Sequence, residues 1–196
     1  MLNTRYLQMG EPDKNQIRES YNTLGGRLYD LRYESEQKLK YEIILRYVKI
    51  NSADMVLDIG CGTGLFLQKL DVQCVGLDIS PALVSGARLR LKWSPTKSLV
   101  LSDADFLPFR SHIFNKVFAI TLIQNIADPE KSMSEMMRVA FDSATIIVTA
   151  LKRAFTAEKF KEKIMKSDIQ LNRLIDDESI KDWIVLASSQ RERVSD

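Results

Sequence analysis

The sequence contains only two cysteines, one histidine and five prolines among its 196 residues. Cys61 and Cys74 are too few to cross-link a secreted domain, and they lack the spacing of a metal site. The single histidine, His112, excludes a site with several histidine ligands. The longest hydrophobic runs fall far short of the roughly 20 residues that a membrane-spanning helix needs, and the N-terminus lacks the apolar core of a signal peptide. We therefore predict a cytoplasmic protein that holds no metal.

An excess of one charge is also missing, because 28 basic and 26 acidic side chains leave a formal net charge of +2. This balance neither requires nor excludes a nucleic-acid partner. Hydrophobic residues make up 45% and charged residues 28% of the chain, which excludes a disordered or collagen-like protein. The length fits one domain of ordinary size.

The hydrophobic pattern changes near residue 50. Before this point, apolar residues recur at helical spacing over residues 39–48, and a shorter helical segment over residues 17–28 is interrupted at Gly25 and Gly26. After it, short apolar runs alternate with helical segments. The predicted strands are residues 55–59, 74–79, 98–101, 116–122, 144–150, 169–174 and 183–188. The predicted helices are residues 65–70, 80–92, 128–139 and 156–166.

The predicted strands are apolar without strict alternation, which is typical of a parallel sheet buried on both faces. The last two strands are separated only by a short polar segment around Asp176, too short for a helical crossover. We therefore expect these two to form an antiparallel pair. The pattern predicts an α/β fold in one domain with a helical N-terminal extension.

One segment carries chemical information, the strand and glycine loop Val56–Gly64, with the sequence VLDIGCGTG. Glycines let the chain turn sharply after the first strand and let a ligand approach the backbone. Asp78 ends the second strand, where a carboxylate can accept hydrogen bonds from both ribose hydroxyls of a nucleoside. The alternative is that the glycines only form a tight turn.

The glycine spacing, G-x-G-x-G, differs from the G-x-G-x-x-G of dinucleotide-binding proteins. Asp58, just before the glycines, would face a pyrophosphate unfavourably, but it suits a ligand with a positively charged amine. S-adenosylmethionine carries a sulfonium and an ammonium group and no phosphate. We therefore predict that it is the cofactor.

Three motifs together, VLDIGCGTG, GLDIS and DADFLPF (residues 103–109), resemble the class I S-adenosylmethionine-dependent methyltransferases. Within that class the chain is most similar to the group that holds ubiquinone-biosynthesis and RNA-modifying enzymes. The resemblance covers about residues 15–190. It implies a Rossmann-like sheet of seven strands in the order 3-2-1-4-5-7-6, with strand 7 antiparallel. It also implies a helical extension over residues 1–50, which acts as a lid over cofactor or substrate, and a methyltransferase core over residues 51–196.

The resemblance also implies which residues hold the cofactor. Asp78 would bind the ribose, Asp103 would accept from the adenine amine, and Thr121 would line the pocket near the sulfonium. Tyr21 or Tyr29 would cover the cofactor, with a structural role as the alternative. The full predicted cofactor-binding set is Tyr29, Asp58, Gly60, Cys61, Gly62, Gly64, Asp78, Ile79, Asp103, Ala104 and Thr121.

One segment departs from the family pattern. Residues 138–144 lack the Pro-Gly-Gly turn that commonly precedes the fifth strand. This departure leaves the cofactor motifs intact but leaves the geometry of that loop open.

Methyl transfer is an in-line displacement in which positioning supplies much of the acceleration. No two prolines are adjacent, so the Asn/Asp-Pro-Pro-Tyr motif of adenine-N6 and glutamine-amide methyltransferases is absent. Cys61 lies in the cofactor loop and Cys74 in a core strand, which argues against the cysteine chemistry of carbon-5 pyrimidine methylation. Gln124 and Asn125 are the candidate catalytic residues. The alternative is that they cap a helix or bind loop backbone.

The methyl acceptor is predicted from a cluster of basic residues without an acidic neighbour: Arg88, Arg90, Lys92 and Lys97. With Trp93 beside them they could contact RNA phosphates, or they could form a solvated helix face. We predict methyl transfer to an rRNA or tRNA base, or to another macromolecular acceptor. The alternatives are a small-molecule methyltransferase, acting on a metabolite or quinone in a pocket roofed by the N-terminal helices, and a non-catalytic cofactor-binding subunit.

A partner is predicted at the strand Ser98–Leu101, which the family order places at an edge of the sheet. The strand is short and apolar and contains neither an inward charge nor a proline, so it can recruit another strand. The resemblance implies a small zinc-binding activator protein there. Self-association is the other possibility. Two alternatives involve no partner: the N-terminal segment folds over the edge, or the edge stays uncovered.

Overall fold

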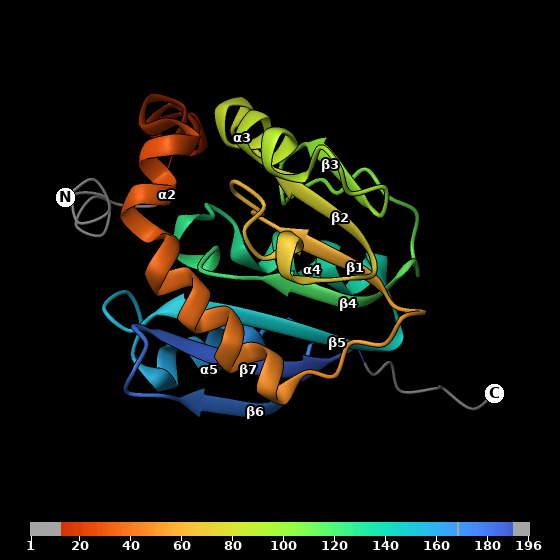
Figure 1. The fold of residues 1–196 in the computed structure, drawn as a ribbon. Coiled ribbons are helices and arrows are strands. Elements are labelled where there is room, and N and C mark those ends of the chain that lie inside the picture. The colour runs from red at the N-terminus through yellow and green to blue at the C-terminus, as the bar shows by residue number, and fades with distance from the viewer. Residues whose placement is uncertain (1–12, 168, 190–196) are drawn as a thin grey trace.

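The computed structural model describes residues 13–167 and 169–189. Seven strands form one sheet in the order β3-β2-β1-β4-β5-β7-β6. β7 runs antiparallel to both β5 and β6, and the other neighbouring strands are parallel. The predicted fold class and strand order are confirmed (Figure 1). The strands are β1 (Met55–Ile59), β2 (Gln73–Asp78), β3 (Lys97–Leu101), β4 (Phe114–Ala119), β5 (Ala140–Leu151), β6 (Gln170–Asp176) and β7 (Asp182–Ser188).

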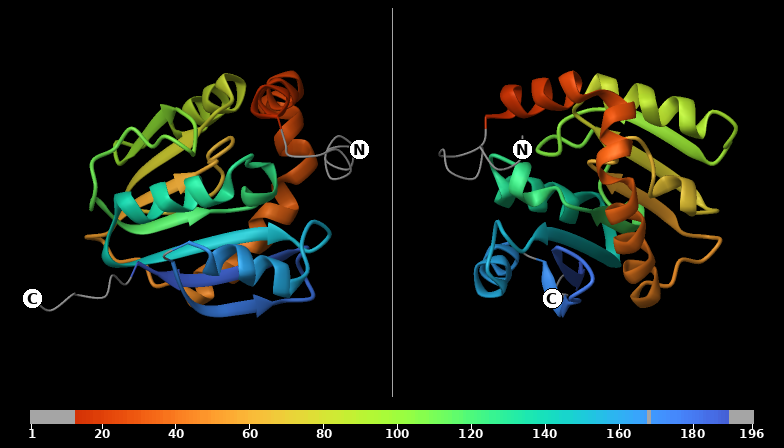
Figure 2. Two further views of the ribbon diagram at one scale, coloured as in Figure 1. Left: turned by 180° about the vertical axis from the view of Figure 1, so that it is seen from behind. Right: turned by 60° about the vertical axis from the view of Figure 1, so that its left-hand side comes forward.

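Helices cover both faces of the sheet (Figure 2). One face packs against α4 and α5, and the other packs against α2, α3 and the loop after β1. In β1, Leu57 belongs to the first hydrophobic cluster and Val56 to the second, which explains why the strands show no alternation of apolar and polar residues. The helices are α2 (Lys14–Tyr47), α3 (Pro81–Leu91), α4 (Pro129–Val139) and α5 (Ala157–Met165), with short 3-10 helices η2 (Leu67–Lys69) and η3 (Ile123–Asn125).

α2 is two helical arms joined by a kink. Gly25 has φ 66° and ψ 160°, a conformation that favours glycine. The helix is therefore broken at the position where the sequence predicted a break. The Asp13 side chain caps the first arm by accepting from the amides of Asn15 and Gln16. The second arm crosses one face of the sheet (Figures 1 and 2). The first twelve residues of the predicted extension lie outside the described part of the chain.

Several predicted boundaries differ from the structure; the strand expected over residues 116–122, for example, is β4 and ends at Ala119. The helix expected over residues 65–70 is only the 3-10 turn η2, whose start has no side-chain cap. β5 begins at Ala140, directly after α4, instead of at residue 144. Ser143, with φ 66°, takes the left-handed conformation within β5, and the pairing of β4 with β5 is irregular at this point. A strand extension with a bulge therefore replaces the glycine turn of the family pattern.

None of the helices in the described ranges is long and apolar enough to cross a membrane. In the same part of the chain, no cluster of three or more His, Cys, Asp or Glu side chains could hold a metal ion.

Candidate functional site

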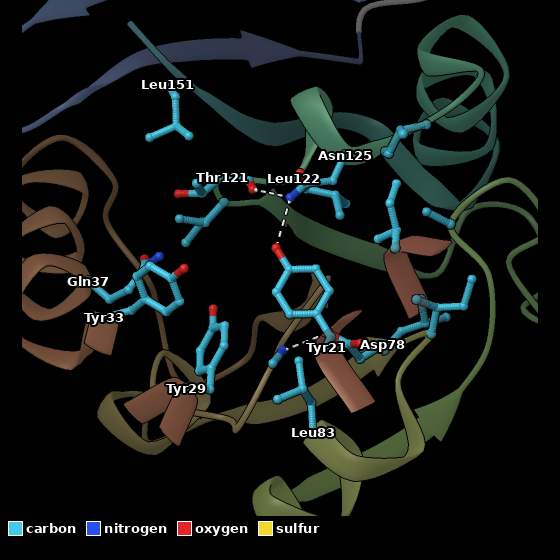
Figure 3. Close-up of a pocket in the computed structure, with 18 of the residues that line it drawn as sticks. Tyr21, Tyr29, Tyr33, Gln37, Asp78, Leu83, Thr121, Leu122, Asn125 and Leu151 are labelled. Atoms are coloured by element: carbon cyan, nitrogen blue, oxygen red, sulfur yellow. Dashed lines mark hydrogen bonds between the residues drawn. The ribbon is translucent and has the colours of Figure 1, made fainter. Parts of the chain in front are cut away.

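A cavity of about 240 Å³ lies at the carboxyl ends of the parallel strands. This is where α/β sheets bind ligands, because the loops diverge there at the change of strand order. α2 forms one side of the cavity. The loop after β1, the end of β2 and the segments after β3, β4 and β5 form the others. Figure 3 shows residues from these elements facing a common space.

Most of the predicted cofactor residues line this cavity. They are Tyr29, Gly60, Gly62, Asp78, Ile79, Asp103, Ala104 and Thr121. Asp58, Cys61 and Gly64 are buried and are not among the residues that line it. The structure therefore brings the residues of five separate segments together around one space, and their roles toward the cofactor remain predictions.

Asp78 is held in place by the backbone. Its Oδ2 accepts from the Gly62 amide at 2.9 Å, and its Oδ1 accepts from the Ser80 amide, also at 2.9 Å. Each carboxylate oxygen can accept a second hydrogen bond, so both oxygens remain able to bind ribose hydroxyls. Burial raises the pKa of Asp78, while the amide hydrogen bonds favour its ionised form.

Asp58 lies on β1 and is buried. Burial, with a smaller contribution from the negative charge of Asp78, raises the pKa of Asp58 from 3.8 to about 8. A positively charged ligand nearby would favour the ionised form of this carboxyl group, as the predicted cofactor would.

Asp58 is expected to make the ligand-free protein less stable as the pH rises from 5 to 7. Because the folded state holds the Asp58 proton more tightly than the unfolded chain, it binds more protons in this interval, and the free energy of unfolding falls with pH. We expect the free energy of unfolding to fall by about 1–2 kcal/mol between pH 5 and pH 7. One group can contribute at most about 1.4 kcal/mol for each pH unit. Urea unfolding at several pH values should show a flatter profile for Asp58→Asn, whereas Asp71→Asn at an exposed site should keep the wild-type slope. Equal slopes for wild type and Asp58→Asn would contradict this.

The first turn of α2 is tied to the predicted adenine end of the cavity. The Lys14 ammonium lies 2.8 Å from Asp103 Oδ2 and also pairs with Asp105. Asp105 is buried and accepts a hydrogen bond from Ser132 of α4. Lys14 carries no sequence signal that points to this role, because its partners lie about 90 residues away in the chain.

Tyrosines from α2 line the side of the cavity opposite the sheet. The ring centroids of Tyr21 and Tyr29 are 6.1 Å apart, and those of Tyr29 and Tyr33 are 5.1 Å apart. The hydroxyl of Tyr21 accepts from Asn125 at 3.2 Å (Figure 3). Burial raises the pKa of Tyr21 and Tyr29, so both stay neutral. The sequence pattern pointed to one covering tyrosine, whereas three line the cavity.

The two candidate catalytic residues differ in position. Gln124 donates to the Thr121 carbonyl and accepts from the Leu151 amide at 3.4 Å, so its amide binds loop backbone. It is not among the residues that line the cavity. Asn125 lines the cavity and donates to Tyr21. Of the two, Asn125 is therefore the one whose side chain can reach a bound molecule.

The site fits S-adenosylmethionine on three observations. Asp78 and Asp103 line the cavity as predicted for ribose and adenine, and the glycine loop directly follows the strand that carries buried Asp58. A pyrophosphate beside the Gly62 amide would meet the carboxylate of Asp78. Fold and site together define a Rossmann-like domain that binds a nucleoside carrying positive charge.

Comparisons with known proteins agree with the predicted class of methyltransferase. The profile of a family described as a methyltransferase domain matches residues 57–148. An uncharacterised protein of Methanocaldococcus jannaschii, MJ1252, is 31% identical over 182 residues, which cover 86% of this chain and 69% of that protein. The chain spans only 34–48% of the length of several plant and bacterial N- and O-methyltransferases that it also matches.

Two solved structures share the fold. A Haloferax volcanii methyltransferase in complex with the Trm112 methyltransferase activator has a TM-score of 0.79 at 16% identity, covering 91% of this chain and all of that one. The geranyl diphosphate C-methyltransferase of Streptomyces coelicolor, solved with S-adenosyl-L-homocysteine, has a TM-score of 0.72 at 10% identity, covering 90% of this chain and 97% of that one. These two structures show the shared fold. The methyltransferase-domain profile and the sequence relatives show that the chain belongs to the class I S-adenosylmethionine-dependent methyltransferases, whose cofactor is S-adenosylmethionine.

Proposed function

We propose that the protein transfers the methyl group of S-adenosylmethionine to a base of RNA. The observation that supports RNA is the cationic end of the cavity, lined by Arg32, Arg153 and Lys181. Lys181 pairs with Glu36 at 2.6 Å, but no carboxylate within the described ranges lies within 4 Å of Arg32 or Arg153. This end therefore carries a net positive charge that suits a phosphate-bearing acceptor.

The charges divide the cavity into two ends. In Figure 3, Tyr33 and Leu151 lie across Tyr21 and Tyr29 from Asp78. Arg32 and Arg153 also line the cavity, and we propose that they form its basic end. The acidic end suits the cationic cofactor, and the basic end suits an anionic acceptor. We propose that the acceptor base enters from the basic end and meets the cofactor between the two.

The protein's own part in the reaction is positioning. The cofactor supplies an electrophilic methyl group when bound, and the acceptor must approach it in line. Thr121 and Leu122 line the wall after β4, the tyrosines of α2 limit access of water, and Asn125 presents a polar group. No side chain is assigned as a general base.

The basic residues around α3 support RNA binding less than their sequence pattern predicted. Arg90 pairs with Asp30 and donates to the Thr63 carbonyl at 2.9 Å. Lys97 donates to the Val72 carbonyl at 2.8 Å. Two of the four basic residues in the predicted cluster therefore bind backbone carbonyls of neighbouring loops and are less available to RNA.

A radiolabelled transfer assay tests the proposal. Total RNA, total protein and a small-molecule extract from the source organism would each be incubated with the protein and labelled S-adenosylmethionine. We expect label in RNA that ribonuclease releases. Label confined to protein or to the small-molecule fraction would contradict an RNA acceptor.

Arg153→Glu is expected to weaken binding of bulk tRNA about tenfold at low salt and to lower the salt slope of binding by about one. The affinity for S-adenosylhomocysteine should stay unchanged, because Arg153 lines the other end of the cavity. Arg110→Glu, at an exposed site, is the matched control. Fluorescence anisotropy with labelled tRNA measures both values. Equal losses in the two variants would argue against a specific role for the basic end.

A second candidate, a small-molecule methyltransferase, is favoured by the tyrosine side chains of α2. The small-molecule alternative requires an acceptor pocket covered by the N-terminal helices, and Tyr21, Tyr29 and Tyr33 all line the cavity from α2. The same radiolabel assay separates the two candidates, because label would then appear in the low-mass fraction.

We further propose that a small activator protein pairs with β3, the edge strand. Leu101 of β3 is 54% exposed, and α3 and the turn after it expose Leu89 by 73% and Trp93 by 85%. Exposed apolar side chains near an open strand edge favour strand addition by a partner. The Haloferax volcanii structure, a fold neighbour solved with an activator, supports the same kind of partner.

The double variant Leu101→Lys and Trp93→Glu is expected to lose at least tenfold in affinity for a co-expressed activator of the Trm112 type. A charge at each position would have to be desolvated on association. Met165→Lys, at an exposed position of α5 near the opposite edge, is the matched control. Light scattering and pull-down measure the complex. A wild-type protein that is an active monomer and captures no activator would defeat the proposal.

A further inference from the structure

An ion pair lies fully buried beside the cavity. Lys40 of α2 and Asp182 at the start of β7 are each 0% exposed, and the Lys40 ammonium lies 2.9 Å from Asp182 Oδ1. That contact is the only polar contact of this oxygen within the described ranges. A buried ion pair adds little net stability over apolar side chains of similar size. Its presence at this position therefore points to a role other than stability.

The pair holds one residue, Thr121. Asp182 Oδ2 accepts from the hydroxyls of Thr121 at 2.8 Å and Thr149 at 3.0 Å. The Thr149 hydroxyl in turn accepts from the Thr121 amide at 2.7 Å, and Lys40 also donates to the Thr121 hydroxyl. Both the backbone N–H and the side chain of Thr121 are therefore bound within this network.

Thr121 needs such support because its φ is 57°. A β-branched residue rarely takes this left-handed conformation. Strained backbone of this kind persists only where surrounding contacts determine it. The network of Lys40, Asp182 and Thr149 supplies those contacts.

The conformation of Thr121 shapes the cavity wall. Leu122, the next residue, packs onto the loop after β1 so closely that a Cβ atom on Gly60 would lie 2.9 Å from Leu122 Cδ1. The Thr121 carbonyl accepts from Asn125, which also holds the Tyr21 hydroxyl. Figure 3 shows Thr121, Leu122 and Asn125 along this wall, with the Tyr21 hydroxyl reaching Asn125 from α2. A rotation at Thr121 would displace all of them.

We propose that Lys40 and Asp182 are positioning residues for methyl transfer: the buried pair holds Thr121 in its left-handed conformation and so sets the cavity wall where cofactor and acceptor meet. This rests on the proposed function of the cavity. The pair also connects α2 to β7, and Lys40 donates to Thr121, so the pair helps to align the helix with the opposite wall of the cavity.

The test replaces the pair by apolar residues of similar size, Lys40→Met with Asp182→Leu, so that no unpaired charge remains. We expect a folded protein whose Thr121 leaves the left-handed region, seen as changed ¹³Cα and ¹³Cβ chemical shifts of Thr121. The turnover number with bulk RNA should fall at least tenfold, and by a larger factor than the affinity for S-adenosylhomocysteine, because Thr121 also lines the cavity. Lys152→Met with Asp176→Leu, which removes a more exposed ion pair at the same end of the sheet, should change neither.

A rescue variant separates positioning from simple packing. Glycine takes a positive φ without support, so Thr121→Gly added to the apolar pair should recover turnover at least threefold. Unchanged Thr121 shifts together with wild-type turnover would overturn the proposal, as would absence of rescue. The chemical shifts and the S-adenosylhomocysteine titration need no acceptor. If wild-type protein methylates no RNA, the proposed acceptor is wrong, and the Thr121 shifts still decide whether the pair positions this wall.

Discussion

Replacing Asp78 by alanine is expected to weaken binding of S-adenosylhomocysteine about 100-fold. In the proposed site the carboxylate accepts from two ribose hydroxyls, and each donor left unpaired in a buried site loses about 1–3 kcal/mol. A total near 3 kcal/mol corresponds to about 100-fold in the dissociation constant. The same change removes the acceptor of the Gly62 and Ser80 amides, so the glycine loop also loses a support. Calorimetry measures the effect.

Two further variants define the cause. Asp78→Asn keeps one oxygen acceptor, so its loss should be smaller than that of the alanine variant. Asp71→Ala, at an exposed site near the start of β2, should leave binding unchanged. A folded Asp78→Ala protein with wild-type affinity would show that the ribose lies elsewhere.

Replacing Lys40 alone by methionine is expected to lower the free energy of unfolding by about 3–5 kcal/mol. The Asp182 carboxylate would remain fully buried without its cation, and such an uncompensated charge is strongly destabilising. Urea denaturation measures the loss. Adding Asp182→Leu should recover most of it, because the buried charge is then removed as well.

The ion pair Lys152–Asp176 is the reference for this measurement. Its atoms are 2.6 Å apart, but the Asp176 side chain is 55% exposed, so Lys152→Met should lose no more than about 1 kcal/mol. If Lys40→Met lost as little, Asp182 would have to find another partner or water in the folded protein. The Lys40–Asp182 contact would then contribute little to the stability of the folded protein.

The buried pair and the cavity together give α2 two functions. Its tyrosines line the cavity where we propose that the cofactor binds, and its Lys40 pairs with Asp182 beside the wall that faces them. Lys14, at the other end of the helix, pairs with Asp103. The helix is thus tied to the sheet on both sides of the cavity, so ligand binding and the position of α2 are expected to be coupled.

Local sequence patterns predicted the α/β elements, and the family resemblance supplied the strand order and the residues expected at one end of the site. The apolar runs, the cap formed by Ser80 and the glycine loop each act within a few residues of the chain. Since parallel strands end at one edge of the sheet, a motif at the end of β1 and Asp78 at the end of β2 had to meet. The edge position of β3 follows from the same strand order.

The other end of the site was decided only by tertiary structure. Thr121 and Asp182 are 61 residues apart in the chain, and Lys40 lies 81 residues before Thr121. No local periodicity predicts that a lysine on a helix will meet an aspartate at the start of the last strand. Likewise, the side chains of Arg90 and Lys97 were drawn into internal contacts with Thr63 and Val72. Such pairings depend on how the packed helices and strands bring distant side chains together, since a charge that loses water must find a partner wherever the fold places one.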